Sequence, residues 1–468
     1  MNDFVPMLKS VRVLSLAHYQ IYHLSAYVGN LKHLRFLDVS FTKIKRLPGT
    51  ICTLQKLQIL LLSHCSELTE LPPDMHRLTA LWHLDLSGTA MTNLFLNMPD
   101  LSKLHAVGKI VGDPSELHKL RDLKHLQNSL CVSISKGTGS LKHSSRSFLQ
   151  HFEGLQKLEI DFISASHDSD VQAEVLRLLE PPCGLKNLSI HGFIGRSFPD
   201  WVRFFRFSQV VSLHIINCEF CLFFPSLGAL PSLEDLRLSG FRNVRRVGAE
   251  LYGGGSQRIT AFKTLKTLIF ENMPEWEEWL PCEGRGCDFR CLKELYIRNC
   301  PKLSGRLPSN IPSLEKLVIS QCPQLNVAPH IFPFMQISES TVLDNTGTVL
   351  GISSLELSFL PQLRRLPQDI YLLTSLISLD ITNIPTIESF PDLPFPKSLL
   401  SLRIDECNAL HSLPSTLMHI VKLFISRCPS LEFFPENGLP ASLKILKINH
   451  CKKVSILCHF KTGLRNQT

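Results

Sequence analysis

Cysteines are the residues of this sequence whose type and spacing come closest to a chemical site. Cys218 and Cys221 have the spacing of one half of a zinc site, and Cys282, Cys287 and Cys291 form a second group. Structural zinc needs four converging thiolate or imidazole ligands, usually supplied by two such pairs. Cys218, however, belongs to a regular pattern described below, and Cys291 directly precedes a leucine of that pattern. We therefore expect no metal site.

Phosphate chemistry and general catalysis have weaker signals still. The triple glycine at 253–255 and the GTGS stretch at Gly137 could imitate a phosphate-cradling loop, but no GxxxxGK[ST] motif supplies the lysine that would reach a phosphate. Histidines, aspartates and serines are plentiful, yet none recurs in a catalytic arrangement. We expect neither an enzyme nor a cofactor.

The elements that carry these residues are repeated along the chain. The segments LKHLRFLDV, LQKLQILLL and LTALWHLDL have second leucines at Leu34, Leu57 and Leu81, which lie 23 and 24 residues apart. Leucines at spacing three, three and two put a short strand on one wall of a coil, with the side chains pointing into a narrow interior. One coil buries little alone, so the coils must stack and their strands must pair in parallel. The pattern is that of a leucine-rich repeat. It predicts an α/β solenoid, a curved horseshoe with a concave parallel β-sheet and a mostly irregular, short-helical convex side.

We expect this pattern to build a single domain over residues 1–468. The stretch 328–350 lacks the pattern and is predicted to be an insertion or an eroded repeat. The predicted segments are regular repeats over 8–104, degenerate repeats with a polar loop over 105–150, repeats over 151–327, the stretch 328–350, repeats over 351–458, and a tail over 459–468.

A cysteine recurs at one position of the repeat. It lies eight residues after the second leucine, or its equivalent, in the coils of Cys65, Cys218, Cys300, Cys322, Cys407, Cys428 and Cys451. A thiol at one structural position per coil packs inward as a small apolar group with a weak donor. This ladder and the odd total of 15 cysteines predict free thiols in a reduced, intracellular protein.

Charge and hydropathy exclude two other classes of protein. A net charge of +8 is mild for 468 residues, and the absence of a block of basic residues argues against a nucleic-acid partner. No run of 18 or more apolar residues exists, so we expect no membrane span.

The solvent-facing strand residues are the candidates for binding. They include Asp38 and Asp85 in the first coils and aromatic or basic residues in the C-terminal half. The residues predicted to bind protein on the concave face are Tyr296, Arg298, Arg403, Phe424, Arg427 and Lys447. Trp276 and Trp279 are expected to fix an outer loop to the core.

Longer segments resemble the repeat region of coiled-coil-type plant NLR (NBS-LRR) disease-resistance proteins. MPEWEEW (273–279) after a repeat strand is the most specific of them. The others, in the family's order, are AVGKIVGDPSEL (106–117), EVLRLLEPPCGLKNLSIHGFIGRSFPDW (174–201), SLGALPSLEDLRLSGFRNVRRVGAELYG (226–253) and CPKLSGRLPSNIPSLEKLVISQCPQL (300–325).

The resemblance implies a recognition and regulatory module of plant innate immunity. Its implied partners are a pathogen effector or guarded host protein and the nucleotide-binding domain of a complete receptor, whose switch it would inhibit. The implied location is the cytoplasm, or the nucleus or a membrane reached through partners. Because the phosphate-loop motif of the family's nucleotide-binding domain is missing, we expect a truncated receptor.

Two alternatives stay open. A leucine-rich-repeat scaffold or substrate adaptor of another intracellular complex would show the same repeats, although no F-box-like segment precedes Leu8. An extracellular receptor is less favoured, because Asn187 and Asn466 begin the only N-x-[ST] sequons and Asn187 falls on a predicted strand.

Overall fold

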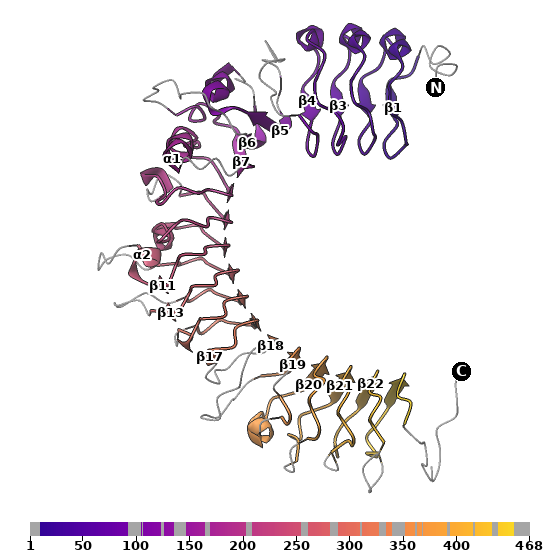
Figure 1. The fold of residues 1–468 in the computed structure, drawn as a ribbon, viewed down its shortest axis with the longest axis vertical. Helices are drawn as coiled ribbons and strands as arrows, with labels where there is room; N and C mark the ends of the chain where they lie inside the picture. The colour runs from indigo at the N-terminus through magenta and orange to yellow at the C-terminus, as the bar shows by residue number, and fades with distance from the viewer. Residues whose placement is uncertain are drawn as a thin grey trace. The chain divides into compact units, whose positions relative to one another are not determined.

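The structure is a computed structural model in which stacked coils each contribute one strand (Figure 1). It describes residues 10–91, 104, 106–122, 126–134, 147–163, 169–202, 208–253, 261–280, 289–308, 311–326, 334–338, 352–360, 363–366, 368–390, 394–414, 417–432 and 439–453.

The chain divides into two compact units. Unit 1 comprises Met1–Asn243, Glu250–Leu265 and Gly284–Cys287, and unit 2 comprises Val244–Ala249, Lys266–Glu283 and Asp288–Thr468. The expectation of a single domain over 1–468 stays a prediction.

Unit 1 contains a sheet in which each strand pairs in parallel with the strand of the next coil. Its strands are β1 (Val13–Ser15), β2 (Phe36–Asp38), β3 (Ile59–Leu61), β4 (His83–Asp85), β5 (Ala106–Gly112), β6 (Asn128–Ile134), β7 (Leu155–Phe162), β8 (Asn187–His191), β9 (Ser212–Ile216) and β10 (Asp235–Ser239).

Unit 2 repeats this arrangement, again with parallel pairing from coil to coil. Its strands are β12 (Thr267–Glu271), β14 (Glu294–Arg298), β16 (Lys316–Ser320), β18 (Phe334–Ser338), β19 (Ser354–Ser358), β20 (Ser378–Thr382), β21 (Ser401–Asp405), β22 (Lys422–Ser426) and β23 (Ile445–Asn449).

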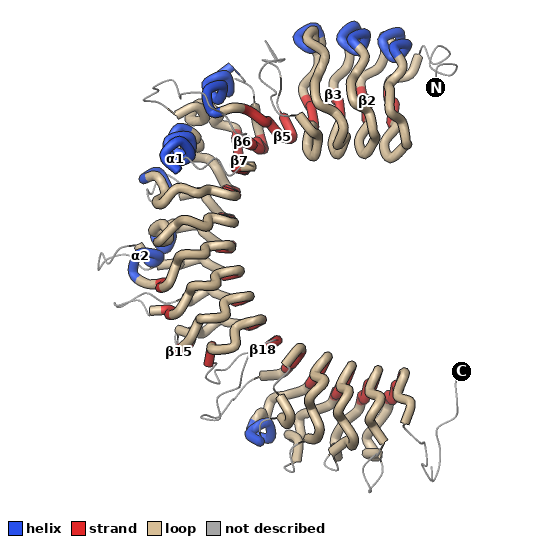
Figure 2. The backbone as a smooth tube through the Cα atoms, in the orientation of Figure 1, coloured by secondary structure: helices blue, strands red, loops and turns tan. Residues whose placement is uncertain are grey.

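The side of the coils opposite the strands carries short helices, loops and two-residue strands (Figure 2). The α-helices are α1 (Ser169–Leu178) and α2 (Ala249–Tyr252). The 3-10 helices are Ala26–Asn30, Gly49–Thr53, Met75–Arg77, Pro114–Asp122, Asp200–Val202, Leu227–Ala229 and Gln368–Leu372. The short strands are β11 (Arg246–Val247), β13 (Glu278–Trp279), β15 (Gly305–Arg306) and β17 (Leu325–Asn326).

The core is a stack of leucine layers between these two sides. Leu37 pairs in register with Leu60, and Leu60 with Leu84, and all three are fully buried. Because strand side chains alternate, the residues on either side of each core leucine face solvent. Each strand therefore presents alternate side chains to solvent.

A left-handed residue follows most of the strands. Three residues after the central outward residue of a strand, the chain takes a positive φ, as at Asn272, Asn299 and Asn383. Asparagine and glycine tolerate this conformation, which turns the chain away from the sheet. Phe41 and Arg427 occupy the same position at φ 58° and 50°.

The predicted leucine-rich-repeat solenoid, with a parallel sheet on one side and short helices and loops on the other, is confirmed. The stretch 328–350 contains β18, which pairs with β16 on one side and β19 on the other. Most of the polar loop within 105–150, and all of the tail at 459–468, lie outside the described residues. None of the described helices is long and apolar enough to span a membrane.

Candidate protein-binding surface

The register of unit 2 defines one central row of strand residues, which we call the centre row; all but the buried Val318 are at least partly exposed. It consists of Ile269, Tyr296, Val318, Gln336, Glu356, Asp380, Arg403, Phe424 and Lys447. Four of the predicted binding residues, Tyr296, Arg403, Phe424 and Lys447, lie in this row. Gln336 was missed because its strand has no recognisable leucine pattern.

Tyr296 is held in place by its neighbours. Its hydroxyl donates a 2.5 Å hydrogen bond to Glu294 Oε2, and burial together with this bond raises the pKa of the tyrosine. The Arg298 guanidinium lies 4.8 Å from the ring centroid and the Lys316 ammonium 5.3 Å from it. Two cations over one half-buried ring are favourable cation–π contacts, so the structure presents Tyr296 and Arg298 as a preorganised pair.

Phe424 is surrounded by positive charge. Arg403 precedes it and Lys447 follows it in the centre row, and Lys422 lies two residues earlier on the same strand. The Lys447 ammonium is 5.9 Å from the Phe424 centroid. All three cationic side chains are at least partly exposed. The described sheet face thus carries a half-buried ring among three basic side chains here.

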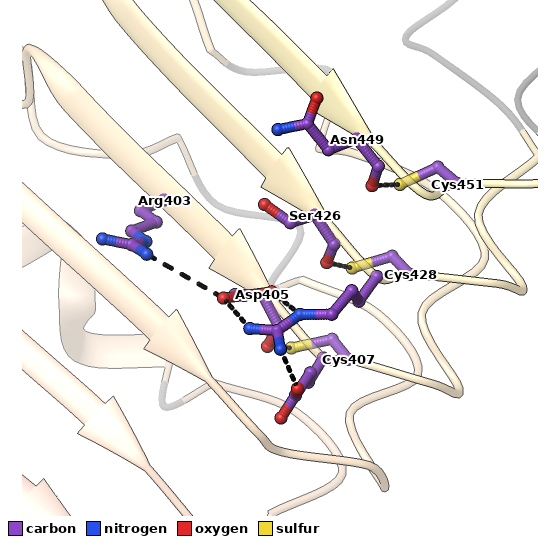
Figure 3. Close-up of polar contacts among 9 residues, drawn as sticks. Arg403, Asp405, Cys407, Ser426, Cys428, Asn449 and Cys451 are labelled. Atoms are coloured by element: carbon purple, nitrogen blue, oxygen red, sulfur yellow. Dashed lines mark hydrogen bonds and ion pairs between the residues drawn. The ribbon is translucent and has the colours of Figure 1, made fainter.

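Arg427 belongs to a different arrangement, centred on the carboxylate of Asp405, which Figure 3 labels. The Asp405 side chain is only 8% exposed at the end of β21, and Arg427 donates to it from Nε at 2.9 Å and from Nη2 at 2.6 Å. Arg427 also pairs with Glu406, whereas the Arg403 Nη2 atom lies 3.9 Å from Asp405 Oδ2. A bidentate pair of this kind fixes both side chains.

The predicted strand position of Arg427 is therefore wrong, although its side chain is 54% exposed; its role in protein binding stays a prediction. Arg427 follows β22 at the left-handed position, and its charge is already neutralised by two carboxylates. Arg403 keeps more freedom, because Asp405 bonds primarily to Arg427.

Two carboxylates occupy the next part of the centre row. Gln336 Nε2 donates to Glu356 Oε1 at 3.2 Å, and Ser378 Oγ donates to Asp380 Oδ1 at 3.4 Å. Burial raises the pKa of both carboxyl groups, and the charge of Asp380 raises that of Glu356 further. Arg403 opposes the shift at Asp380 without cancelling it. Burial therefore disfavours the charged form of both carboxyl groups, and the protein's own cations do not fully offset this effect.

The cysteine ladder lies below the sheet face. The Sγ atoms of Cys407, Cys428 and Cys451 donate to the carbonyl oxygens of Asp405, Ser426 and Asn449 at 3.6, 3.2 and 3.4 Å (Figure 3). The hydrogen bond with Cys407, together with burial, raises the pKa of Cys428. A protonated, buried thiol satisfies a turn carbonyl and is a poor nucleophile. The described cysteines are free thiols.

The candidate zinc cysteines differ in burial. Cys218 and Cys221 are buried, and Cys221 Sγ donates to the Gly195 carbonyl oxygen at 3.0 Å. Cys291 is exposed, and Cys282 and Cys287 lie outside the described residues. No group of three or more potential ligands that could hold a metal occurs among the residues that the structure describes.

Unit 1 brings together a serine, a histidine and an aspartate whose proximity was not predicted from the sequence. His214 Nε2 lies 2.8 Å from Asp235 Oδ2, and Ser212 Oγ lies 3.3 Å from the same nitrogen and 3.0 Å from the same oxygen. A catalytic triad needs one ring nitrogen for the serine and the other for the carboxylate. Here a single nitrogen faces both groups. The cluster therefore joins β9 to β10, and the hydrogen bond from His214 lowers the pKa of Asp235. The one-coil separation of these residues was the signal available in the sequence.

The acidic residues of the first coils bind their own turns. Asp38 Oδ1 accepts from the Ser40 backbone amide at 2.9 Å, and Asp85 Oδ1 accepts from the Ser87 amide at 3.0 Å. Each carboxylate thus stabilises the end of its own strand.

The outer-loop tryptophans form an aromatic cluster. Trp276 is completely buried, and its centroid lies 4.8 Å from Phe270 and 5.7 Å from Trp279. Trp276 Nε1 donates to the Glu278 carbonyl oxygen at 2.9 Å. The cluster fixes the outer loop to the core, as the sequence predicted.

Comparison with known proteins identifies the repeats. A family model described as a leucine-rich repeat region matches residues 3–325. The chain belongs to this family. RPP13-like protein 1 of Arabidopsis thaliana, which is named for disease resistance, is 33% identical over 450 residues, covering 88% of this chain and 40% of that protein. Disease resistance protein RGA2 of Solanum bulbocastanum is 29% identical over 228 residues, covering 47% of this chain and 23% of that protein.

These relatives confirm the predicted resemblance to the repeat region of plant disease-resistance proteins, and the chain spans less than half of their length. Among solved structures, the Leptospira interrogans LRR protein LIC12759 is 17% identical with a TM-score of 0.42, covering 95% of this chain and 98% of that one. The TLR13–ssRNA13 complex gives 16% identity and a TM-score of 0.48, covering 96% and 73%. At such identities the likeness concerns the fold alone.

Proposed function

We propose that this leucine-rich repeat region is a protein-recognition and regulatory module of plant innate immunity. It binds a pathogen effector or a guarded host protein and restrains the nucleotide-binding switch of a complete receptor in the cytoplasm. The names of the relatives support the setting. The observation that carries the recognition role is the exposed cationic and aromatic part of the centre row, at Arg403, Phe424 and Lys447.

Aromatic and arginine side chains with a rigid support are the residue types that dominate protein-binding energy. Phe424 is half-buried on a paired strand, so little conformational freedom is lost when a partner covers it. The three cations around it have no carboxylate partner closer than the 3.9 Å contact of Arg403 among the described residues. Their attraction is therefore available to a partner.

The restraint of a companion domain has less support at the first coils. Asp38 and Asp85 use one carboxylate oxygen to hold their own turns, and Asp38 also accepts from Ser15 Oγ at 3.2 Å. Only the remaining hydrogen-bond acceptor sites of these two carboxylates are available to basic elements of another domain.

Charge reversal tests the assignment. A library of pathogen effectors is screened against the chain by yeast two-hybrid, and each interaction is measured again with Arg403→Glu plus Lys447→Glu. The control is Lys302→Glu plus Lys397→Glu on outer loops, where Lys302 makes an exposed pair with Glu275. We expect loss with the first pair and retention with the second.

The opposite pattern would place binding on the outer side. Binding of a substrate of a ubiquitin ligase in place of effectors would favour the adaptor alternative.

A further inference from the structure

The charge along the centre row changes sign between β20 and β21. Glu356 and Asp380 form an acidic pole on β19 and β20, and Arg403 and Lys447 form a basic pole on β21 and β23 around Phe424. The same register that pairs the strands fixes the order of these five residues. A partner that satisfies both poles must carry complementary charges in the same order.

Short side chains flank the acidic pole. The neighbouring strand residues are Ser354 and Ser378 before it and Ser358 and Thr382 after it, of which Ser358 is only 5% exposed. They do not screen the carboxylates from a partner above the sheet.

An apolar rim runs beside this row at the beginning of the strands. Ile377 is 49% exposed and Leu400 is 43% exposed, and the backbone amide of Leu400 donates to the Ile377 carbonyl oxygen at 2.9 Å. The two side chains therefore lie on adjacent coils. A partner that crosses the strands can cover this rim with apolar side chains while its charged side chains reach the centre row.

Resting on the proposed recognition role of this face, we infer that the partner element is an amphipathic α-helix lying across β19–β23. Its basic side chains lie over Glu356 and Asp380, and its acidic side chains lie over Arg403 and Lys447. Its apolar stripe covers Phe424, Ile377 and Leu400.

The geometry favours a helix over an extended segment. β20, β21 and β22 each have strand partners on both sides, so they offer no free backbone edge to an added strand. An extended segment pressed against this face would lose the hydration of its peptide groups without gaining partners, whereas a helix satisfies its own.

The strand spacing sets the charge spacing of that helix. The centres of the two poles are about two and a half strands apart, or roughly 12 Å at about 4.8 Å per strand. A helix rises about 1.5 Å per residue, so its basic and acidic groups are separated by about eight residues, or two turns.

The test uses two synthetic, alanine-based helical peptides of identical composition. In the block peptide, two lysines and two glutamates are two turns apart on one face with leucines between them; in the interleaved peptide, the charges alternate. Binding to the full chain is measured by fluorescence anisotropy. We expect the block peptide to bind about tenfold more tightly, since several exposed ion pairs each add a small term.

Variants of the acidic pole provide the control. Glu356→Gln plus Asp380→Asn, which keep the side-chain shapes, should remove the preference for the block peptide. Lys397→Glu on an outer loop should leave it unchanged. Equal affinity of the two peptides for the wild-type chain would overturn the inference. Effector binding that still depends on Arg403 and Lys447 would in that case leave the proposed function standing.

Discussion

At the residue scale, the structure separates side chains that serve the fold from those that face a partner. Arg427 and Asp405 satisfy each other at the end of two coils, and the ladder thiols satisfy turn carbonyls. The side chains of Arg403 and Lys447 are exposed to solvent. Residue type alone does not distinguish Arg403 from Arg427. The distinction comes from the carboxylates that each guanidinium reaches.

Thiol reactivity should follow burial. Burial raises the pKa of Cys218 and raises that of Cys131 to about 12, so the thiolate fraction of both is small at pH 8. Timed alkylation with mass spectrometry should label the exposed Cys183 and Cys291 first, and the buried ladder cysteines, a group that excludes the half-buried Cys451, only after denaturation. Early labelling of Cys218 in the native protein would contradict this order.

The acidic pole should destabilise the fold at neutral pH. The folded state raises the pKa of Glu356 and Asp380, so it binds more protons than the unfolded state, and stability falls as pH rises through that window. Glu356→Gln plus Asp380→Asn should therefore raise the melting temperature at pH 7. The difference should close below the ordinary values of 4.5 and 3.8.

Glu432 provides a control of opposite sign. Its hydrogen bond with Lys453 lowers its pKa, so Glu432→Gln should not raise the melting temperature at pH 7. Stabilisation by both changes would point to a general effect of removing negative charge.

At the scale of elements, the sequence predicts the strands well and their surroundings poorly. The leucine spacing gives the register, and three of the predicted binding residues, Arg403, Phe424 and Lys447, lie in the centre row on β21, β22 and β23. β18 was not predicted, because its buried residues are Met335 and Ile337, which do not form the leucine pattern. The burial of Asp405 was not predicted either, because it depends on Arg427, which lies one coil away at a left-handed position.

Damage to one coil should stay local. Leu379 is fully buried in β20, and its truncation to alanine should cost about 2 to 5 kcal/mol through lost burial and a cavity. Because coils contact chiefly their neighbours, hydrogen exchange should accelerate in β19, β20 and β21 and change little in β14.

The matched control is Ile377→Ala on the same coil, where the side chain is half exposed. It should cost much less in urea unfolding. Equal acceleration of exchange throughout unit 2 after Leu379→Ala would show that the coils do not behave as nearest-neighbour modules.

At the scale of the whole molecule, the first and last described strands differ from the internal strands. Leu14 of β1 and Leu446 and Ile448 of β23 are only half-buried, whereas the equivalent leucines of internal strands are fully buried. Val13 is 65% exposed. Each end strand has a single strand partner among those that the structure describes. Unpaired strand edges beside apolar side chains favour association.

We expect the isolated chain to self-associate through these end strands. Val13→Lys plus Ile445→Lys places charge at both edges, where it opposes pairing with another chain, and should shift the micromolar sedimentation profile toward monomer. Ile377→Lys is the matched control, because Ile377 is 49% exposed and Ile445 is 39% exposed, but Ile377 directly precedes β20, a strand with partners on both sides. If exposed apolar area alone drives association, the control will act as strongly as either end substitution. An effect limited to the end substitutions would assign the association to the strand edges. A wild-type chain that is already monomeric would contradict the expected self-association.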